Sequence, residues 1–119
     1  MNKRKLMDYL LAKPGSKPSY PFGPGTLVFK VGGKMFALLA EDERPWTMNL
    51  KSDPDDALAL RAAYPSITPG YHMNKRYWNT LRLDGSLPDP LIRELIDQSY
   101  DLVFRGLTKI EREKVLRTQ

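Results

Sequence analysis

The sequence predicts one α+β domain in which an antiparallel sheet is covered on one face by the terminal helices. Three observations predict this fold class. Strand-like segments are grouped between residues 27 and 50, helix-like segments lie near both ends, and aspartate–proline pairs at 53–54 and 89–90 mark helix starts. A chain of 119 residues can bury its own core. Since no internal repeat is present, we expect a single domain over residues 1–119.

The N-terminal part is expected to hold one helix and one irregular loop. Leu6, Tyr9 and Leu10 share a face of a helix predicted over residues 3–13, and the following Pro-Gly pair ends it. Residues 14–25 contain four prolines and three glycines, so we expect a turn-rich loop without regular structure there.

The central part is expected to form three strands. Apolar residues alternate over 27–31, Gly32-Gly33 suits a tight turn, and residues 35–40 return as the second strand of a hairpin. After an acidic connection, residues 46–50 are predicted as a third strand.

The second half is expected to add three helices and a strand. A helix capped by Asp53 is predicted to end before Pro65, and residues 77–83 alternate as a strand does. The pair at 89–90 opens the longest helix, which ends at Gly106. Thr108 and Glu111 form a capping box for a final short helix. The longest helix has an apolar stripe made of Ile92, Leu95, Ile96, Ser99 and Val103.

Composition narrows the classes of function and partner. The net charge of +5 and the pI near 9.5 favour anionic partners. The absence of cysteine excludes disulfides and thiolate sites. The longest apolar run, Met35 to Ala40, is too short to span a bilayer, and residues 3–12 make no convincing signal peptide. We therefore expect a cytoplasmic protein with no membrane partner.

Catalysis and metal binding find little support. His72 is the only histidine, and no serine lies in a nucleophile-elbow context. The acidic run at 41–43 lies in a connection where charges usually serve solubility, and the acids at 53–56 are explained by helix capping. We therefore expect no enzyme, no metal and no cofactor.

The segment from Pro69 to Thr80 is the strongest indication of function. It combines basic and aromatic side chains and lies within residues 57–83, which contain no acid. This combination suits a nucleic acid, since phosphates attract the charges and bases offer flat faces. Trp78 is expected in the core. The candidate nucleic-acid-binding residues are Lys30, Lys34, Lys51, Arg61, Tyr71, His72, Asn74, Lys75, Arg76, Tyr77 and Arg82.

Two hypotheses remain open on these residues. The first is DNA binding of low sequence specificity, in which phosphates supply most of the affinity. Asn74 and Asn79 have the chemistry to read adenine, but we expect them to bond backbone in turns. The second is a non-enzymatic domain that binds another protein or a small ligand in a groove around His72 and Trp78. The sequence does not indicate an oligomeric state.

Several strings in a fixed order resemble the MmcQ/YjbR family of small bacterial proteins over about residues 8–105. They include PFG at 21–23, GKMFALL at 33–39, PGYHMNKRYWNT at 69–80 and LDGSLPD at 83–89. The family's H-M-N-K string falls on residues 72–75 and its W-N-T on 78–80. Tyr77 stands where many members carry a second histidine.

This resemblance implies a frataxin-like α+β fold with a curved antiparallel sheet packed by helices. It also implies DNA binding by the sheet and projecting loops as a double wing, without enzymatic activity. Frataxins hold iron on acids of their first helix, but residues 3–13 here carry four basic side chains and only Asp8 as an acid. The iron site therefore does not transfer.

Overall fold

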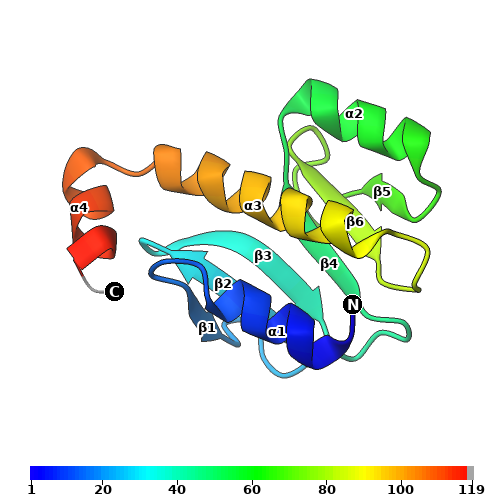
Figure 1. Cartoon of the computed structure of the whole chain (residues 1–119), viewed down its shortest axis with the longest axis horizontal. Coiled ribbons are helices and arrows are strands. Elements are labelled where there is room, and N and C mark those ends of the chain that lie inside the picture. The colour runs from blue at the N-terminus through cyan, green and yellow to red at the C-terminus, as the bar shows by residue number, and fades with distance from the viewer. Residues whose placement is uncertain (118–119) are drawn as a thin grey trace.

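The computed structural model describes residues 1–117 and contains four helices and six strands (Figure 1). In chain order these are α1 (Lys3–Leu11), β1 (Lys17–Ser19), β2 (Thr26–Val31), β3 (Lys34–Ala40), β4 (Thr47–Lys51), α2 (Pro54–Ala63), β5 (Ile67–Pro69), β6 (Trp78–Arg82), α3 (Asp89–Arg105) and α4 (Lys109–Arg117).

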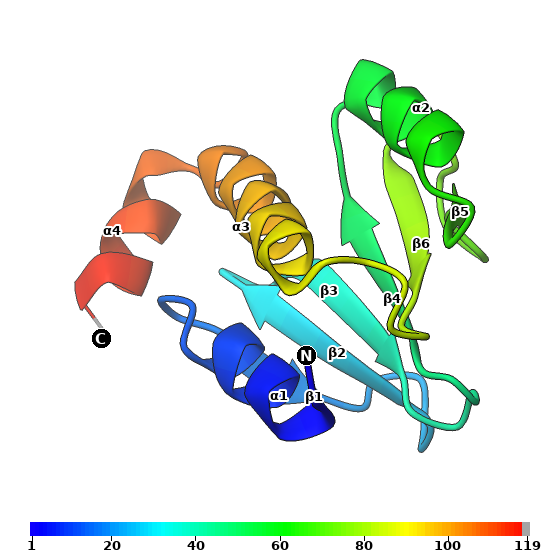
Figure 2. The same ribbon diagram turned by 45° about the vertical axis from the view of Figure 1, so that its right-hand side comes forward.

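The strands form one antiparallel sheet in the order β1-β2-β3-β4-β6-β5. Helices α1 and α3 lie across one face of this sheet, α2 lies beside β5 and β6, and α4 lies beyond the β2–β3 turn (Figures 1 and 2). The predicted fold class, α+β with an antiparallel sheet covered on one face by helices, is confirmed.

The main core fills the space between the sheet and the helices. Alternate residues of β2, among them Leu27 and Phe29, point to this side together with the apolar stripe predicted for α3. Phe36 meets Tyr100 of α3 edge-on, with ring centroids 5.3 Å apart. The buried Ser99 donates to the carbonyl of Phe36 at 2.6 Å and accepts from the amide of Lys51 at 2.8 Å. This hydroxyl therefore ties α3 to two strands.

Two strands were not predicted. Residues 17–19 form β1, although residues 14–25 were expected to be irregular, and residues 67–69 form β5. Each contains a proline, Pro18 or Pro69, which cannot donate a ladder hydrogen bond. Both strands lie at the sheet's edges, the place where a strand tolerates proline.

The helix starts are partly as predicted. Thr108 and Glu111 bond reciprocally, since the amide of Thr108 donates to Glu111 Oε1 at 2.8 Å and the amide of Glu111 donates to Thr108 Oγ1 at 3.1 Å. The expected cap by Asp53 is wrong, because its side chain makes no capping hydrogen bond. Asp89 is the first helical residue of α3, and its carboxylate accepts from the amino group of Met1. Both acids lie close to the positive ends of their helices.

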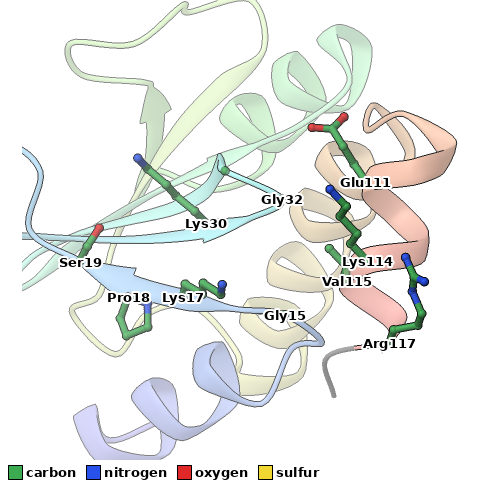
Figure 3. Close-up of a pocket in the computed structure, with 11 residues that line it drawn as sticks. Gly15, Lys17, Pro18, Ser19, Lys30, Gly32, Glu111, Lys114, Val115 and Arg117 are labelled. Atoms are coloured by element: carbon green, nitrogen blue, oxygen red, sulfur yellow. The ribbon is translucent and has the colours of Figure 1, made fainter.

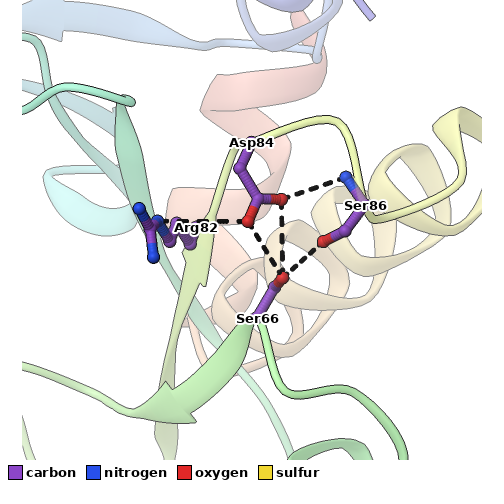
Figure 4. A network of polar contacts seen from close by, with 4 residues as sticks. All are labelled: Ser66, Arg82, Asp84 and Ser86. Atoms are coloured by element: carbon purple, nitrogen blue, oxygen red, sulfur yellow. Dashed lines mark hydrogen bonds and ion pairs between the residues drawn. The ribbon is translucent and has the colours of Figure 1, made fainter.

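A polar network fixes the turn between β6 and α3 (Figure 4). The carboxylate of Asp84 accepts from the amide of Ser86 at 3.0 Å, and Ser66 donates to it from the edge of β5. Hydrogen bonds from Ser86 lower the pKa of Asp84 below its usual value. The guanidinium Nε of Arg82 lies 3.9 Å from this carboxylate. Arg82, a candidate DNA contact, is therefore already paired on the sheet.

Within residues 1–117, no helix combines the length and the apolar character needed to cross a membrane.

Candidate functional site: a basic cleft and an open-face groove

The two ends of the sheet differ in the charged side chains that lie nearest to their turns. At one end the register brings together the β2–β3 turn and the pair Lys51 and Trp78. Lys30 and Lys34 flank that turn. At the other end, residues 41–43 (Glu-Asp-Glu) leave β3 beside the row formed by Thr47 and Arg82. Lysines thus predominate around the hairpin turn, the basic end, although Asp53, Asp55 and Asp56 follow Lys51 there. Acids predominate at residues 41–43, although Arg44 and Arg82 lie at that end too.

At the basic end a cleft of about 650 Å³ opens between the sheet and α4 (Figure 3). One wall is β1 with the turn before it, together with the tip of the β2–β3 hairpin. The other wall is α4. The lining residues are Gly15, Lys17, Pro18, Ser19, Lys30, Gly32, Gly33, Glu111, Lys114, Val115 and Arg117.

Close glycine contacts set the distance between these walls. Gly32 has φ +57, and a Cβ there would lie 2.7 Å from Leu107, just before α4. A Cβ on Gly15 would lie 2.8 Å from Val115 within α4. Either substitution requires the side chain of Leu107 or Val115 to move, and both glycines occupy the left-handed region that favours glycine, Gly15 with φ +70. The cleft therefore depends on glycine at both positions.

The cleft carries a strong positive charge. Lys17, Lys30, Lys114 and Arg117 face a single acid, Glu111, and none of these four forms an ion pair within the described part of the chain. The Glu111 carboxylate is engaged by Thr108, whose backbone and hydroxyl hydrogen bonds lower the pKa of Glu111. An anion is the ligand that such a site attracts.

Sequence reasoning found Lys30 but missed Lys17, Lys114 and Arg117. Lys17 lies on β1, which was expected to be a loop, and α4 meets the hairpin only through tertiary packing. The one local indication was the i, i+3 spacing of Lys114 and Arg117, which places them on one side of a helix.

Residues 70–77, within the basic segment Pro69 to Thr80, form a largely exposed loop at the basic end of the sheet. Lys75 and Arg76 are both exposed. The guanidinium of Arg76 lies over the ring of Tyr77, and the distance from its Cζ atom to the ring centroid is 5.6 Å. The amide of Ser52, which follows Lys51, donates to the carbonyl of Tyr77 at 2.7 Å. The structure therefore brings Lys51 close to this loop.

Four residues that the sequence analysis considered have structural roles. Arg61 donates from Nε to Asn79 Oδ1 at 2.7 Å and from Nη2 to the carbonyl of Lys75. The side-chain oxygen of Asn74 accepts from the amide of Arg76 at 3.0 Å, as expected for a turn. Asn79 is buried against α2 and does not lie in a turn, so that part of the expectation is wrong. Trp78 belongs to a small core, as expected.

The second site lies on the sheet face that α1 and α3 leave uncovered. Cross-strand neighbours form its floor: Thr26, Ala40 and Thr47 in one row, and Leu38 and Asn49 in the next. A groove of about 520 Å³ runs over them. It is lined by Phe22, Thr26, Met35, Leu38, Ala40, Asp42, Glu43, Thr47, Asn49, Tyr71, His72 and Met73.

Hydrogen bonds hold the groove's wall against the sheet. Thr80 Oγ1 donates to Asn49 Oδ1 at 2.5 Å and accepts from the amide of Tyr71 at 3.0 Å. Asn49 Nδ2 donates to the carbonyl of Tyr71 at 3.2 Å. His72 has φ +61, and its ring lies 3.9 Å from that of Tyr71 between centroids. Tyr71 and His72 are exposed and belong to this groove, whereas the cleft lies elsewhere.

Residues 1–117 contain no group of three or more histidine, cysteine, aspartate or glutamate side chains placed to hold a metal ion.

Comparison with known proteins agrees with the architecture. The model of the YjbR family matches residues 11–102. The chain belongs to the YjbR family. The YbdF protein of Escherichia coli O157:H7 is 45% identical over 119 residues, covering 97% of this chain and 98% of that protein. The YjbR protein of Escherichia coli K12 is 36% identical over 116 residues, covering 98% of both.

Solved structures of similar proteins have the same fold. A crystal structure of Deinococcus radiodurans protein DR2400 has a TM-score of 0.88 and 42% identity, covering 94% of this chain and 86% of that chain. A Pseudomonas syringae crystal structure has a TM-score of 0.74 and 34% identity, covering 87% and 99%. The resemblance to the YjbR family is therefore confirmed. The family match contains every groove residue, while the α4 wall of the cleft lies beyond it.

Proposed function

We propose that this YjbR-family protein binds duplex DNA with low sequence specificity, through phosphate contacts at the basic end of its sheet. The observation that carries the proposal is the cleft in which Lys17, Lys30, Lys114 and Arg117 lie without ion-pair partners in the described chain. Unpaired cations in a concave surface attract a polyanion, and release of its condensed counterions drives binding.

A second group of cations extends the proposed surface along the same end of the sheet. Lys34 follows the hairpin turn, Lys51 ends β4, and Lys75 and Arg76 project from the adjoining loop. A duplex presents phosphates along two strands, so a protein that contacts it benefits from cations spread across several elements. Tyr77, 38% exposed beside Arg76, adds a polar aromatic ring to the edge of this surface.

Low specificity is expected because the two asparagines with the chemistry to read adenine are engaged within the protein. Both amide atoms of Asn79 bond inside the fold, and the side-chain oxygen of Asn74 is bonded in its turn. Reading adenine needs the donor and acceptor of one amide together. The available groups are lysine and arginine, which mainly contact phosphates.

The test is fluorescence anisotropy of a labelled generic duplex at several salt concentrations. Phosphate contact predicts a linear fall of the logarithm of the binding constant with the logarithm of salt concentration, and the slope reports the number of contacts. Unrelated duplexes should bind with similar affinity. No binding at low salt would refute the proposal.

A further inference from the structure

The groove on the open face differs from the cleft in both shape and charge. We propose that it binds an organic ammonium ion with an apolar body, such as an aryl- or alkylamine. The groove adjoins the loop that carries Lys75 and Arg76, but none of the cations of the proposed DNA surface lines it, and the inference does not depend on DNA binding.

The size and floor of the groove suit a small molecule. Its volume of about 520 Å³ falls within the range of roughly 300–1,000 Å³ typical of ligand pockets. Leu38, Met35 and Met73 supply apolar surface, and they pack on the small core around Trp78. Methionine adapts to irregular apolar partners because its side chain is unbranched and polarizable. The floor therefore accommodates the apolar body of the ligand.

Exposed aromatic rings line the groove from two separate loops. Phe22, which precedes β2, is 64% exposed, and Tyr71, which follows β5, is 68% exposed. Large rings left this open to water usually mark a binding surface when they border one concavity. Their π faces attract cations, as in the aromatic sites that recognise ammonium groups.

The charge of the groove selects the same ligand. Asp42 and Glu43 line it together with His72, whose ring packs on that of Tyr71, and no lysine or arginine does, although the whole chain carries a net charge of +5. Neither carboxylate forms an ion pair within residues 1–117. The nearby Arg44 donates to the carbonyls of Glu41 and Glu43. The carboxylates thus remain free to face an ammonium group.

Neighbouring side chains do not neutralise the acidic end of the groove. Arg82 shares a sheet row with Thr47, but its guanidinium lies by Asp84 and is not part of the groove. The hydroxyls of Thr26 and Thr47 on the floor offer acceptors for ammonium protons. The groove therefore combines an apolar floor, aromatic walls and an acidic end.

Two matched series of probes test the inference at pH 7. One is 2-phenylethylamine, 2-phenylethanol and 3-phenylpropionate, and the other is hexylamine, hexanol and hexanoate. Binding is followed by backbone NMR shifts of the full chain. Each amine should bind about tenfold tighter than its alcohol, since cation–π and carboxylate contacts add together. The shifts should centre on residues 38–49 and 71–73, and the carboxylates should bind weakest.

Variants assign the binding to the groove. Replacing both acids (Asp42→Asn with Glu43→Gln) should bring each amine to within about twofold of its alcohol. It should leave the alcohol's affinity unchanged, which separates lost charge from lost folding. Lys114→Gln, in the cleft, is the control and should change neither the affinity for the amines nor the affinity for the alcohols.

Tighter binding of a carboxylate, equal binding of all three members of a series, or shifts centred outside the groove would overturn the inference. So would the absence of saturable shifts with both amines. Each of these results leaves the DNA-binding test untouched, because that test depends on lysines and arginines, none of which lines the groove.

Discussion

Arg61 and Asn79 form a side-chain clamp between α2 and β6. Arg61 Nε donates to Asn79 Oδ1 at 2.7 Å, and Asn79 Nδ2 donates to the carbonyl of Ala57 at 3.2 Å. Asn79 is only 2% exposed, so its amide depends on these partners. The guanidinium is thus engaged within the protein, although the acid-free stretch around it indicated a phosphate contact.

Arg61→Ala should therefore destabilise the fold. It leaves the buried oxygen of Asn79 without its donor, and we expect the free energy of unfolding to fall by about 1–3 kcal/mol, measured by urea denaturation. The salt slope of duplex binding should be unchanged. A variant as stable as the wild type, with a smaller salt slope, would make Arg61 a phosphate ligand instead.

Thr80→Val should loosen the wall of the groove. The hydroxyl joins Asn49 to the amide of Tyr71. Its loss should therefore cost about 1 kcal/mol and speed hydrogen exchange at the Tyr71 amide. Thr68→Val is the matched control, since Thr68 lies opposite Thr80 on β5 and its hydroxyl makes no hydrogen bond within residues 1–117. Equal exchange in both variants would remove the anchoring role from Thr80.

Acid should weaken the start of α4. Bonds from Thr108 lower the folded-state pKa of Glu111 below its unfolded value. The stabilisation is therefore present above the unfolded pKa and is lost as pH falls through the folded pKa. NMR titration should show the Thr108 amide shifting together with the Glu111 carboxyl. Glu111→Gln keeps an oxygen acceptor and should abolish that shift. Its persistence in this variant would assign the titration to another acid.

Alkali should weaken the contact between α1 and α3. The hydroxyl of Tyr9 donates to Asp97 Oδ1 at 2.7 Å, and partial burial with this bond raises the pKa of Tyr9 to about 12. The unfolded chain deprotonates near 10, so this stabilisation is complete below pH 10 and disappears as pH rises through about 12. Tyr9→Phe should flatten the stability profile in that window. An unchanged profile would contradict the assignment.

The local sequence was sufficient to predict elements whose structure depends on residues close together in the chain. The hairpin follows from alternation around Gly32-Gly33, and the capping box from Thr108 and Glu111. It failed for β1 and β5, because a proline in a three-residue strand looks the same as a proline in a loop. Only pairing with the next strand along the chain, β2 for β1 and β6 for β5, makes these segments strands.

The sites were harder to predict because they are tertiary. The cleft joins residues 15–33 to residues 111–117, and the sequence gives no measure of how α4 meets the hairpin. The segment at residues 69–80 looked like one functional unit. In the structure its residues divide among a basic loop, the wall of a groove and the small core beneath that groove, because residues 70–77 form a loop and only residues 78–80 belong to β6.

The central claim is that the cleft contacts phosphates, and the salt slope of duplex binding tests it most directly. The triple variant Lys17→Gln, Lys30→Gln and Lys114→Gln should reduce the slope by about 3, since each lost phosphate contact removes about one unit. The control is Arg4→Gln, Lys5→Gln and Arg93→Gln on the helices. Both variants reduce the 19 basic residues to 16 against 14 acids, so net charge falls from +5 to +2 in each. The predicted result is a smaller salt slope in the cleft variant than in the control variant. Equal slopes in the two variants would contradict phosphate contact by the cleft.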